Sequence, residues 1–325
     1  MWRYGGPEAL RVVELPDPEP GPGEVLIRVH AAAVNPTDTM LRSGAHAARL
    51  QAAAPPYVAG MDAAGVVERL GAGVDDRLLV GQSVVALVVP AGPARGRGAY
   101  AERVVVPAAS VVAAPDGVDF PAASTLLMNA MTARVALDEL ALRPGQTLAV
   151  TGAAGAFGGY AVQLAKADGL RVVADAAPAD EELVQGLGPD EVVARGDGVA
   201  GRIRELVPDG VDGLADGAVL ESLVLPAIAD GGGLAVVRGW AGPTERGITL
   251  RRVQVSQRAG DTAALERLSR QAGDGTLTLR VARVLPAAEA AEAHRLLAAG
   301  GIRGRLVLDF AAGLADAPAE GPDAA

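Results

Sequence analysis

The first third of the chain alternates short apolar runs rich in Val, Ile and Ala with clusters of Pro and Gly. Runs of this length and composition, bounded by turn residues, are typical of β-strands. We expect four strands here, at residues 24–34, 63–71, 82–89 and 99–107. This part of the chain is therefore predicted to be β-rich.

From about residue 119 the apolar pattern changes to an alternation of helix-like and strand-like segments. A long helix is expected over 120–140, and a strand is expected over 146–152. Further helices are expected within 151–169, 180–188 and 201–207, and further strands at 171–176, 191–195, 211–216 and 231–239. This βαβ rhythm predicts a parallel, doubly wound sheet.

After about residue 283 the pattern changes again, to an amphipathic helix at 287–300 and a strand at 303–310. We therefore expect a β-rich domain, built from residues 1–118 and 283–325, that encloses an α/β domain of residues 119–282. The small and acidic residues from about 313 onward are expected to be disordered, because they offer little apolar surface to bury.

Composition and charge exclude several classes of function. Half of the residues are hydrophobic but only 3% are aromatic, so the core must consist mostly of Ala, Val and Leu, which suits α/β layers. The net charge of −10 and the scattered arginines, with Lys166 as the one lysine, argue against nucleic-acid binding. The absence of cysteine excludes disulfides and thiolate–metal sites. No signal-like or membrane-spanning apolar run is present, so a soluble cytoplasmic protein is expected.

The stretch TGAAGAFGGYAVQLAKADG, residues 151–169, is glycine-rich at its start and helical in pattern at its end. It is open to two interpretations, a phosphate-binding loop or an empty tight turn between a strand and a helix. In the first, glycine lets the backbone approach a pyrophosphate, and the N-terminus of the helix offers free N–H groups to the anion. The βαβ context favours this interpretation, for the loop residues Gly152, Ala153, Ala154, Gly155, Ala156, Phe157 and Gly158.

Several motifs in order along the chain carry a family resemblance. The segment 152–174 resembles the loop, helix and strand of the zinc-lacking quinone oxidoreductase (zeta-crystallin-like) branch of the medium-chain dehydrogenase/reductases. AAAVNPTDTMLRSG (31–44) and PPYVAGMDAAGVV (55–67) are similar to its N-P-x-D and P-G-x-D-x-A-G segments, and 98–108 and 292–308 also match. The resemblance implies an α/β protein with a doubly wound parallel (Rossmann) sheet domain and a β-rich GroES-like catalytic domain.

The chain departs from this family at several positions. Ala156-Phe157 replaces the usual Gly-Val of the loop, and Ala59 replaces a usual proline. Asp212 and Asp216 are kept in VDGLADGAV, but Val219 stands where a glycine is common. A bulkier loop would hold the pyrophosphate less closely, so loss of cofactor binding is an open alternative.

The resemblance also bears on metal binding. Zinc-dependent relatives use cysteines and a His-Glu pair as ligands, whereas this chain has no cysteine and carries Met61-Asp62 where the pair would stand. His30, His46 and His294 are widely separated and form no ligand-spaced motif. We therefore expect no metal, and hydride transfer to an acceptor that delocalises its own charge, such as a quinone or an α,β-unsaturated carbonyl.

Four residues are expected on the nicotinamide side of the site, each with a structural alternative. Asn35 matches the family asparagine near the nicotinamide, but Asn-Pro also reads as a turn. His46 falls where relatives carry a cofactor-contacting tyrosine, and its alternative is a surface-loop histidine. Tyr57 either contributes to the pocket or packs beneath it. Thr132 matches a helix threonine that reaches the nicotinamide, or it faces a helix groove.

Two further polar residues receive structural interpretations. Asp38 is also a candidate for the pocket, but it is interpreted as a helix cap rather than an acid. His294 matches a family position but lies in the C-terminal helix, so it is interpreted as structural.

The adenosine end of the cofactor site gives conflicting signals. Asp175 lies twenty residues after Gly155, where an acidic residue usually binds the ribose of NAD, but one residue before the family position. Arg195 occupies the place where NADPH-dependent relatives carry a basic residue, and its alternative is an ordinary solvated arginine. We favour NADP(H) over NAD(H) because of Arg195. Cofactor contacts are also expected at Val237, Arg238 and Gly239.

These observations together predict an NADPH-dependent quinone or enone reductase with a small-molecule substrate. The alternatives are an enoyl-thioester or polyketide-tailoring reductase of the same branch, and a nucleotide-binding protein without turnover. The resemblance further implies a homodimer, formed through an edge strand near 231–239 or 247–255.

Overall fold

The computed structural model describes residues 1–45, 47, 54–89 and 97–311. His46 and the expected disordered tail from residue 313 lie outside the described residues. The chain forms two compact units. The first holds residues 1–128, 259–273 and the chain from residue 279 onward, and the second holds residues 129–258 and 274–278.

The first unit contains a mixed, mostly antiparallel sheet in the order β12-β13-β1-β2-β3-β5, with β4 paired to β1. Its strands are β1 (Glu24–Val34), β2 (Asp62–Leu70), β3 (Ser83–Leu87), β4 (Arg103–Pro107), β5 (Val111–Ala113), β12 (Val281–Pro286) and β13 (Arg305–Asp309). The alternation of β1 buries Val25, Ile27 and Val29, which are at most 2% exposed, in the core of this unit. β-branched side chains of this kind pack well on a pleated surface.

Four α-helices accompany this sheet: α1 (Pro36–Ser43), α2 (Phe120–Ala123), α7 (Thr262–Gly273) and α8 (Ala290–Ala299). Helix α1 begins directly after β1 with Pro36 in its first turn, where the missing N–H of proline costs nothing. It ends at Gly44, whose φ of 86° is the left-handed conformation that glycine adopts most easily. The turn from β1 into α1 therefore fixes the position of Asn35.

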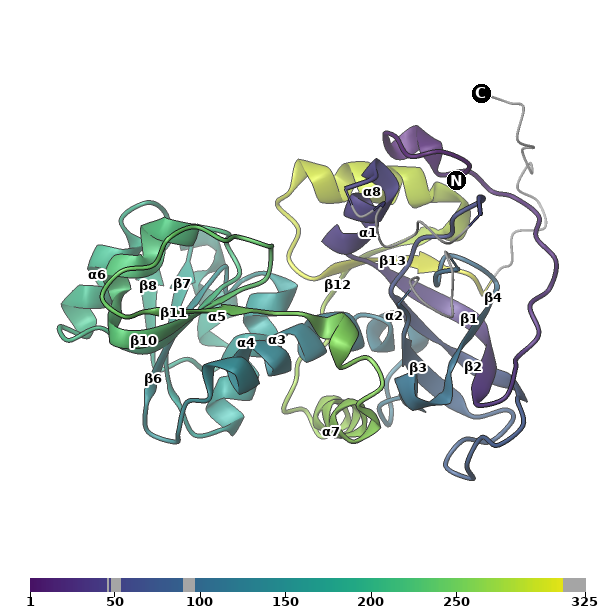
Figure 1. The fold of residues 1–325 in the computed structure, drawn as a ribbon, viewed down its shortest axis with the longest axis horizontal. Helices are drawn as coiled ribbons and strands as arrows, with labels where there is room; N and C mark the ends of the chain where they lie inside the picture. The colour runs from purple at the N-terminus through teal and green to yellow at the C-terminus, as the bar shows by residue number, and fades with distance from the viewer. Residues whose placement is uncertain (46, 48–53, 90–96, 312–325) are drawn as a thin grey trace. The chain divides into compact units, whose positions relative to one another are not determined.

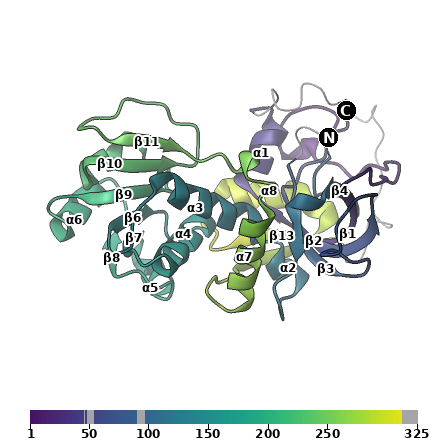
Figure 2. The same cartoon turned by 60° about the horizontal axis from the view of Figure 1, so that its bottom comes forward.

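The second unit contains a six-stranded parallel sheet in the order β11-β10-β9-β6-β7-β8. Figures 1 and 2 show these strands side by side. The strands are β6 (Thr147–Thr151), β7 (Arg171–Ala176), β8 (Glu191–Ala194), β9 (Val211–Asp216), β10 (Ile228–Val236) and β11 (Thr249–Arg252), and the helices are α3 (Leu127–Leu140), α4 (Ala156–Ala167), α5 (Glu181–Gln185) and α6 (Val199–Leu206). The strand order reverses between β6 and β9, and ligands of such sheets bind at this switch point.

The predicted α/β fold with its two sheets is confirmed, although the short strands β5 and β12 were not expected from the sequence. Three further details differ from the sequence expectation. The helix expected over 120–140 is broken into α2 and α3. At the break, the hydroxyls of Ser124 and Thr125 donate back to the carbonyls of Pro121 and Ala122, each at 2.8 Å, and such bonds compete with helix continuation.

The boundary of the enclosed domain also differs from the expected 119–282. Helix α7 was not anticipated, and it belongs to the first unit. Its side chains explain this, because Ser269 Oγ donates to Ala113 O at 2.7 Å and Thr262 Oγ1 donates to Ala109 O at 2.9 Å. These contacts attach α7 to β5 and the turn before it.

The third difference concerns the edges of the parallel sheet. The segment 231–239 was expected to offer an edge strand for dimerisation, but β10 pairs with β9 on one side and with β11 on the other. That part of the prediction is wrong, because both hydrogen-bonding edges of β10 are already used. Of the two candidate segments, 247–255 contains the strand at the sheet edge, β11.

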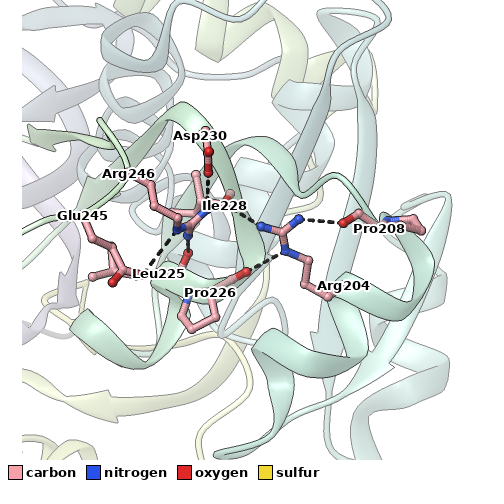
Figure 3. Close-up of polar contacts among 8 residues, drawn as sticks. All are labelled: Arg204, Pro208, Leu225, Pro226, Ile228, Asp230, Glu245 and Arg246. Carbon is pink, nitrogen blue, oxygen red and sulfur yellow. Dashed lines mark hydrogen bonds and ion pairs between the residues drawn. The ribbon is translucent and has the colours of Figure 1, made fainter.

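Two arginines secure the irregular chain that leads into β10 (Figure 3). Arg246 donates to Leu225 O at 2.7 Å and to Ile228 O at 2.8 Å, and it pairs with Asp230 at 2.8 Å. Arg204 donates to Pro226 O at 2.8 Å. A guanidinium with five donors can satisfy carbonyls that a short 3₁₀ helix leaves without partners.

We expect Arg246→Ala to lower the free energy of unfolding by about 2 kcal/mol, because two backbone carbonyls and one carboxylate lose a partly buried donor. Urea unfolding followed by circular dichroism measures this. Arg252→Ala, an exposed arginine on β11, is the matched control and should change stability by less than about 0.5 kcal/mol. Equal effects of the two substitutions would contradict the assignment.

Candidate functional site

The glycine-rich loop follows β6 and leads directly into α4. Gly152 has a φ of 68°, and the N–H of Gly155 donates to Gly152 O at 2.9 Å, which closes a tight turn. A Cβ at Gly158 would lie 2.2 Å from Gly152 O and 2.7 Å from Ala153 Cα. Glycine at 158 is therefore required for α4 to approach the end of β6, and the helix starts with its N-terminus beside the turn.

The bulky Phe157 of this loop is accommodated by a glycine in the neighbouring loop. A Cβ placed on Gly217, just after β9, would lie 2.8 Å from Cδ1 of Phe157. The phenyl ring therefore lies against the Gly217 backbone, where the ends of β6 and β9 meet. The loop therefore accommodates the phenyl ring at position 157 next to a residue without a side chain.

Asp175, near the end of β7, anchors the glycine-rich loop through a hydrogen bond. Its side chain is 3% exposed, and Oδ1 accepts the N–H of Ala153 at 3.1 Å. Burial raises the pKa of Asp175, while hydrogen bonds from the loop amides and the charge of Arg195 act in the opposite direction. The carboxylate therefore anchors the loop, a role that the sequence analysis did not foresee.

A second buried carboxylate connects the two strands at the switch point. Asp216, 2% exposed, accepts Thr151 Oγ1 at 2.7 Å and the N–H of Glu221 at 2.8 Å. Val219 and Glu221 in this loop both have a φ of 58°, which is unfavourable for residues with a side chain. Thr151 was missed from sequence, although its place at the end of a buried strand was a usable signal.

All the expected cofactor residues lie at the same edge of the parallel sheet. Residues 152–158 follow β6, Asp175 ends β7, Arg195 follows β8, and 237–239 follow β10. The carboxyl ends of parallel strands meet at one edge, which is where open α/β sheets bind ligands. Arg195 is exposed there, and its N–H donates to Ala176 O at 2.9 Å.

In the first unit, Asn35 is held by two buried carboxylates. Its backbone N–H donates to Asp38 Oδ2 at 2.8 Å, and its side-chain Nδ2 donates to Asp62 Oδ2 at 2.7 Å. Asp62 Oδ1 also accepts the N–H of Met128 at 2.8 Å, at the start of α3. Asp38 and Asp62 are at most 1% exposed. Since burying a charge is costly, a turn alone does not account for two such groups at one asparagine.

The polar cluster continues from Asp38 to Tyr100 and His294. Tyr100 Oη donates to Asp38 Oδ2 at 3.3 Å and lies 3.2 Å from His294 Nε2. His294 is fully buried, and burial lowers its pKa to about 3. Asp38 thus acts as the predicted capping residue and also takes part in a buried network, to which His294 contributes from α8.

Two of the remaining expected residues, Tyr57 and Thr132, belong to different parts of the described chain. The Tyr57 ring stacks on Tyr4 with centroids 5.3 Å apart, within a small apolar cluster of the first unit. Thr132 is part of α3 in the second unit. His46 lies outside the described residues. The structure therefore brings Asn35 together with Asp38 and Asp62, and Tyr57 with Tyr4.

Two general features of the described residues bear on the site. Among them, no three His, Cys, Asp or Glu side chains are grouped so that they could hold a metal ion. His30 instead stacks on Phe120, with ring centroids 4.5 Å apart. No helix in the described ranges has the length and apolar character needed to cross a membrane.

The buried carboxylates predict a dependence of stability on pH. Burial raises the pKa of Asp38 and of Asp62 to about 7, from 3.8. The folded state therefore binds these protons more tightly than the unfolded state does. This contribution to the free energy of unfolding is complete below the ordinary pKa of 3.8, and it is lost as the pH rises towards 7.

Asp62→Asn removes one of these titrations. Between about pH 4 and pH 7 the wild type should therefore lose stability relative to the variant as the pH rises. The expected slope is about 1 kcal/mol per pH unit, and the difference should be constant above that range. Urea unfolding of both proteins at several pH values measures it. A pH-independent difference would show that Asp62 stays ionised throughout.

Comparisons with known proteins agree with this architecture. Residues 21–116 match the alcohol dehydrogenase GroES-like domain family, and residues 187–308 match the zinc-binding dehydrogenase family. A quinone oxidoreductase of Pseudomonas aeruginosa is 36% identical over 171 residues, which cover 52% of this chain and 49% of that protein. The mouse quinone oxidoreductase is 32% identical over 259 residues, covering 75% of this chain and 73% of that protein.

A solved mycobacterial structure complexed with NADPH is 30% identical, with a TM-score of 0.81 over 95% of this chain and 98% of that one. The match with the Pseudomonas protein spans about half of that relative's length, whereas the mouse protein and the solved structure are matched over most of theirs. The order of the two domains along the chain and the switch point between β6 and β9 agree with these matches. The chain belongs to the zeta-crystallin-like quinone oxidoreductase family of the medium-chain dehydrogenase/reductase superfamily.

Proposed function

We propose that this protein is a zinc-independent, NAD(P)H-dependent oxidoreductase that reduces a quinone or an α,β-unsaturated carbonyl. The observation that carries this proposal is the convergence of the expected cofactor residues at the carboxyl ends of β6, β7, β8 and β10. A glycine turn, an open helix N-terminus and an exposed arginine at one sheet edge form a site for a dinucleotide.

The residues at this edge suit different parts of a dinucleotide. The turn 152–158 and the first turn of α4 would hold the pyrophosphate, because Gly158 keeps the helix N-terminus against the turn. Asp175 and Arg195 would flank the adenosine ribose, and 237–239 follow the strand β10 on the other side of the switch point. When bound, the nicotinamide supplies the hydride.

Asn35, His46, Tyr57 and Thr132 would orient the nicotinamide and the substrate. Asn35 is the best supported of these, because Asp38 fixes its backbone and Asp62 fixes its carboxamide. The Asn35 side chain also accepts the backbone N–H of Asp38, which completes a capping box at the start of α1. An amide oxygen has two lone pairs, so this oxygen can accept a second hydrogen bond, from a carboxamide or hydroxyl group.

The substrate class is inferred from the metal-ligating residues that the sequence lacks. The chain has no cysteine, and Met61-Asp62 replaces the His-Glu pair that zinc-dependent relatives use. A quinone or an enone needs no metal to stabilise the charge that hydride addition produces, because that charge delocalises into a hydroquinone or an enolate. Protein groups then need only bind, orient and exclude water.

The proposed activity is tested by NADPH and NADH oxidation with 1,4-naphthoquinone and with a simple enone. We expect the quinone or the enone to accelerate NADPH loss well above the rate without protein. Cofactor binding measured by calorimetry, with no turnover for any acceptor, would instead support a nucleotide-binding protein without catalysis. A preference for enoyl thioesters would support a tailoring reductase.

The cofactor preference depends on Arg195. We expect Arg195→Ala to weaken NADPH binding about tenfold or more while leaving NADH nearly unchanged, because a charge-assisted hydrogen bond to the 2′-phosphate contributes roughly 1.5–3 kcal/mol. Fluorescence titration of both cofactors measures the ratio. Arg143→Ala, an exposed arginine before β6, is the matched control.

Asp175→Asn completes this test. It removes the negative charge but keeps an oxygen that can accept from Ala153 N–H, so the loop stays anchored. NADPH binding should improve relative to NADH. If Arg195→Ala leaves the NADPH/NADH ratio unchanged, the assignment of Arg195 to the phosphate is wrong.

A further inference from the structure

A row of polar contacts connects helix α8 to the start of helix α1 within the first unit. His294 Nε2 lies 3.2 Å from Tyr100 Oη, and Tyr100 Oη lies 3.3 Å from Asp38 Oδ2. Asp38 in turn accepts the backbone N–H of Asn35 at 2.8 Å and that of Gly60 at 3.1 Å. The proposed reaction uses Asn35 but gives no role to Tyr100 or His294. We call the side chains of His294, Tyr100 and Asp38 the His–Tyr–Asp row.

Both ends of the His–Tyr–Asp row are shielded from solvent. His294 and Asp38 are each 0% exposed. A polar group in such a position has lost its hydrogen bonds to water and needs partners within the protein. The places of the protons in the row therefore decide which of these groups is satisfied.

The imidazole of His294 has one nitrogen with a partner and one without. Nε2 faces Tyr100 Oη, whereas no group in the described part of the chain lies within hydrogen-bond reach of Nδ1. Burial lowers the pKa of His294 to about 3, and the nearby charge of Arg42 acts in the same direction, so the ring is neutral at ordinary pH. A neutral imidazole carries a single N–H, on one nitrogen or the other.

The nitrogen without a partner indicates which tautomer is present. A buried N–H without an acceptor is rarer in folded proteins than a buried acceptor without a donor. The proton of His294 therefore belongs on Nε2, where Tyr100 Oη can accept it, and the lone pair lies on Nδ1. The hydroxyl proton of Tyr100 is then available for Asp38. The hydrogen bonds consequently run in one direction, from α8 to α1.

Asp38 accepts three hydrogen bonds in this arrangement. The Tyr100 hydroxyl joins the N–H groups of Asn35 and Gly60, and all three donors favour the ionised carboxylate. Burial acts against them and raises the pKa of Asp38 to about 7, and the nearby charge of Asp62 acts in the same direction as burial. Asp38 is therefore close to its midpoint at neutral pH, where the loss of one donor changes its ionisation most.

The other charged groups around the row come from several elements of the same unit. Arg305, at the start of β13, lowers the pKa of Tyr100 and of Asp62 by its charge. Arg42 in α1 acts on His294, and Glu8 acts on Arg42. These charges act through space, whereas Tyr100 is the side chain through which α8 reaches Asp38 by hydrogen bonds.

We propose that Tyr100 and His294 are positioning residues for Asn35. His294 donates Nε2–H to Tyr100, Tyr100 donates O–H to Asp38, and the ionised Asp38 holds the backbone of Asn35 at the start of α1. Loss of either donor leaves Asp38 protonated over a wider range of pH and Asn35 held less firmly. The part of Asn35 in catalysis rests on the proposed function, whereas the direction of the row does not.

The direction of the row is tested by nitrogen-15 NMR of the full chain, labelled at the histidine ring nitrogens. The sequence holds three histidines, so His294→Gln identifies the signals of His294. We expect Nε2 of the wild type to carry the proton and Nδ1 to carry none at neutral pH. A proton on Nδ1 would overturn the proposal.

The link to Asn35 is tested by following the amide signals of Asn35 and Gly60 as the pH is varied. Both amides donate to Asp38, so both should titrate with it, and Asp38→Asn should abolish these titrations. Tyr100→Phe should raise the common midpoint by about half a pH unit or more, because the ionised carboxylate loses a donor. Tyr4→Phe, which removes a hydroxyl outside the row, is the matched control and should leave the midpoint in place. Equal midpoints in the wild type and Tyr100→Phe would contradict the proposal.

Two substitutions of His294 separate the donor from the space that the ring fills. His294→Gln keeps an N–H close to the place of Nε2 and should keep the midpoint of the wild type, whereas His294→Leu removes the donor and should raise it. Equal midpoints in these two variants would show that His294 only fills space, and the proposal would be wrong.

The consequence for catalysis is measured as the pH profile of kcat/KM for NADPH oxidation with 1,4-naphthoquinone. In Tyr100→Phe the acid limb should move to higher pH together with the amide midpoint. An acid limb that stays in place while the amide midpoint moves would overturn the positioning role. If the wild type turns over no acceptor, the proposed function fails, and the NMR titrations alone decide whether Tyr100 and His294 hold Asn35.

Discussion

The close approach of α4 to the end of β6 is the constraint on which the candidate cofactor site depends. It exists because Gly158 has no side chain, since a Cβ there would lie 2.2 Å from Gly152 O. From this contact follow the position of the helix N-terminus and the path of the loop. Asp175 then stabilises the loop through Ala153 N–H, and Asp216 connects the loop's strand to the next through Thr151. The bulky Phe157 of the loop is accommodated because Gly217 has no side chain to meet its ring.

The β-rich unit depends on an electrostatic constraint. Two carboxylates with almost no exposure, Asp38 and Asp62, are retained beside one asparagine. Each lone carboxylate accepts backbone or side-chain N–H groups, which offsets part of the cost of burial but leaves the pKa of both raised to about 7. Asn35 is consequently fixed at its backbone and at its carboxamide, as the proposed role in orienting the substrate requires.

The edge strands of the two sheets have different surroundings. In the parallel sheet, β11 is short and carries two arginines, Arg251 and Arg252, which discourage indiscriminate pairing. In the β-rich unit, β4 lines a cavity to which the N-terminal chain from Leu10 to Glu19 also contributes.

The sequence by itself determined the fold class, most strands of both sheets, the βαβ rhythm and the glycine turn, because these depend on local periodicity and on residues close together in the chain. The short strands β5 and β12 were not predicted. It also predicted that Asn35 belongs to the candidate site and that Asp38 caps a helix. It did not reveal that 120–140 is interrupted, since hydroxyls bonding back to carbonyls at Ser124 and Thr125 compete with a strongly helical pattern.

Only the tertiary structure decided the partners of the buried groups. Asn35 meets Asp62 across 27 positions of sequence, and Tyr100 meets His294 across 194, separations over which no periodicity carries information. The same holds for α7, which joins the first unit through Ser269 and Ala113, 156 positions apart. Asp175 was predicted to be a cofactor residue from its spacing, whereas its burial beneath the loop depends on the pairing of β6 with β7. Local sequence patterns determine which helices and strands form, whereas long-range packing determines which buried polar groups hydrogen-bond to one another.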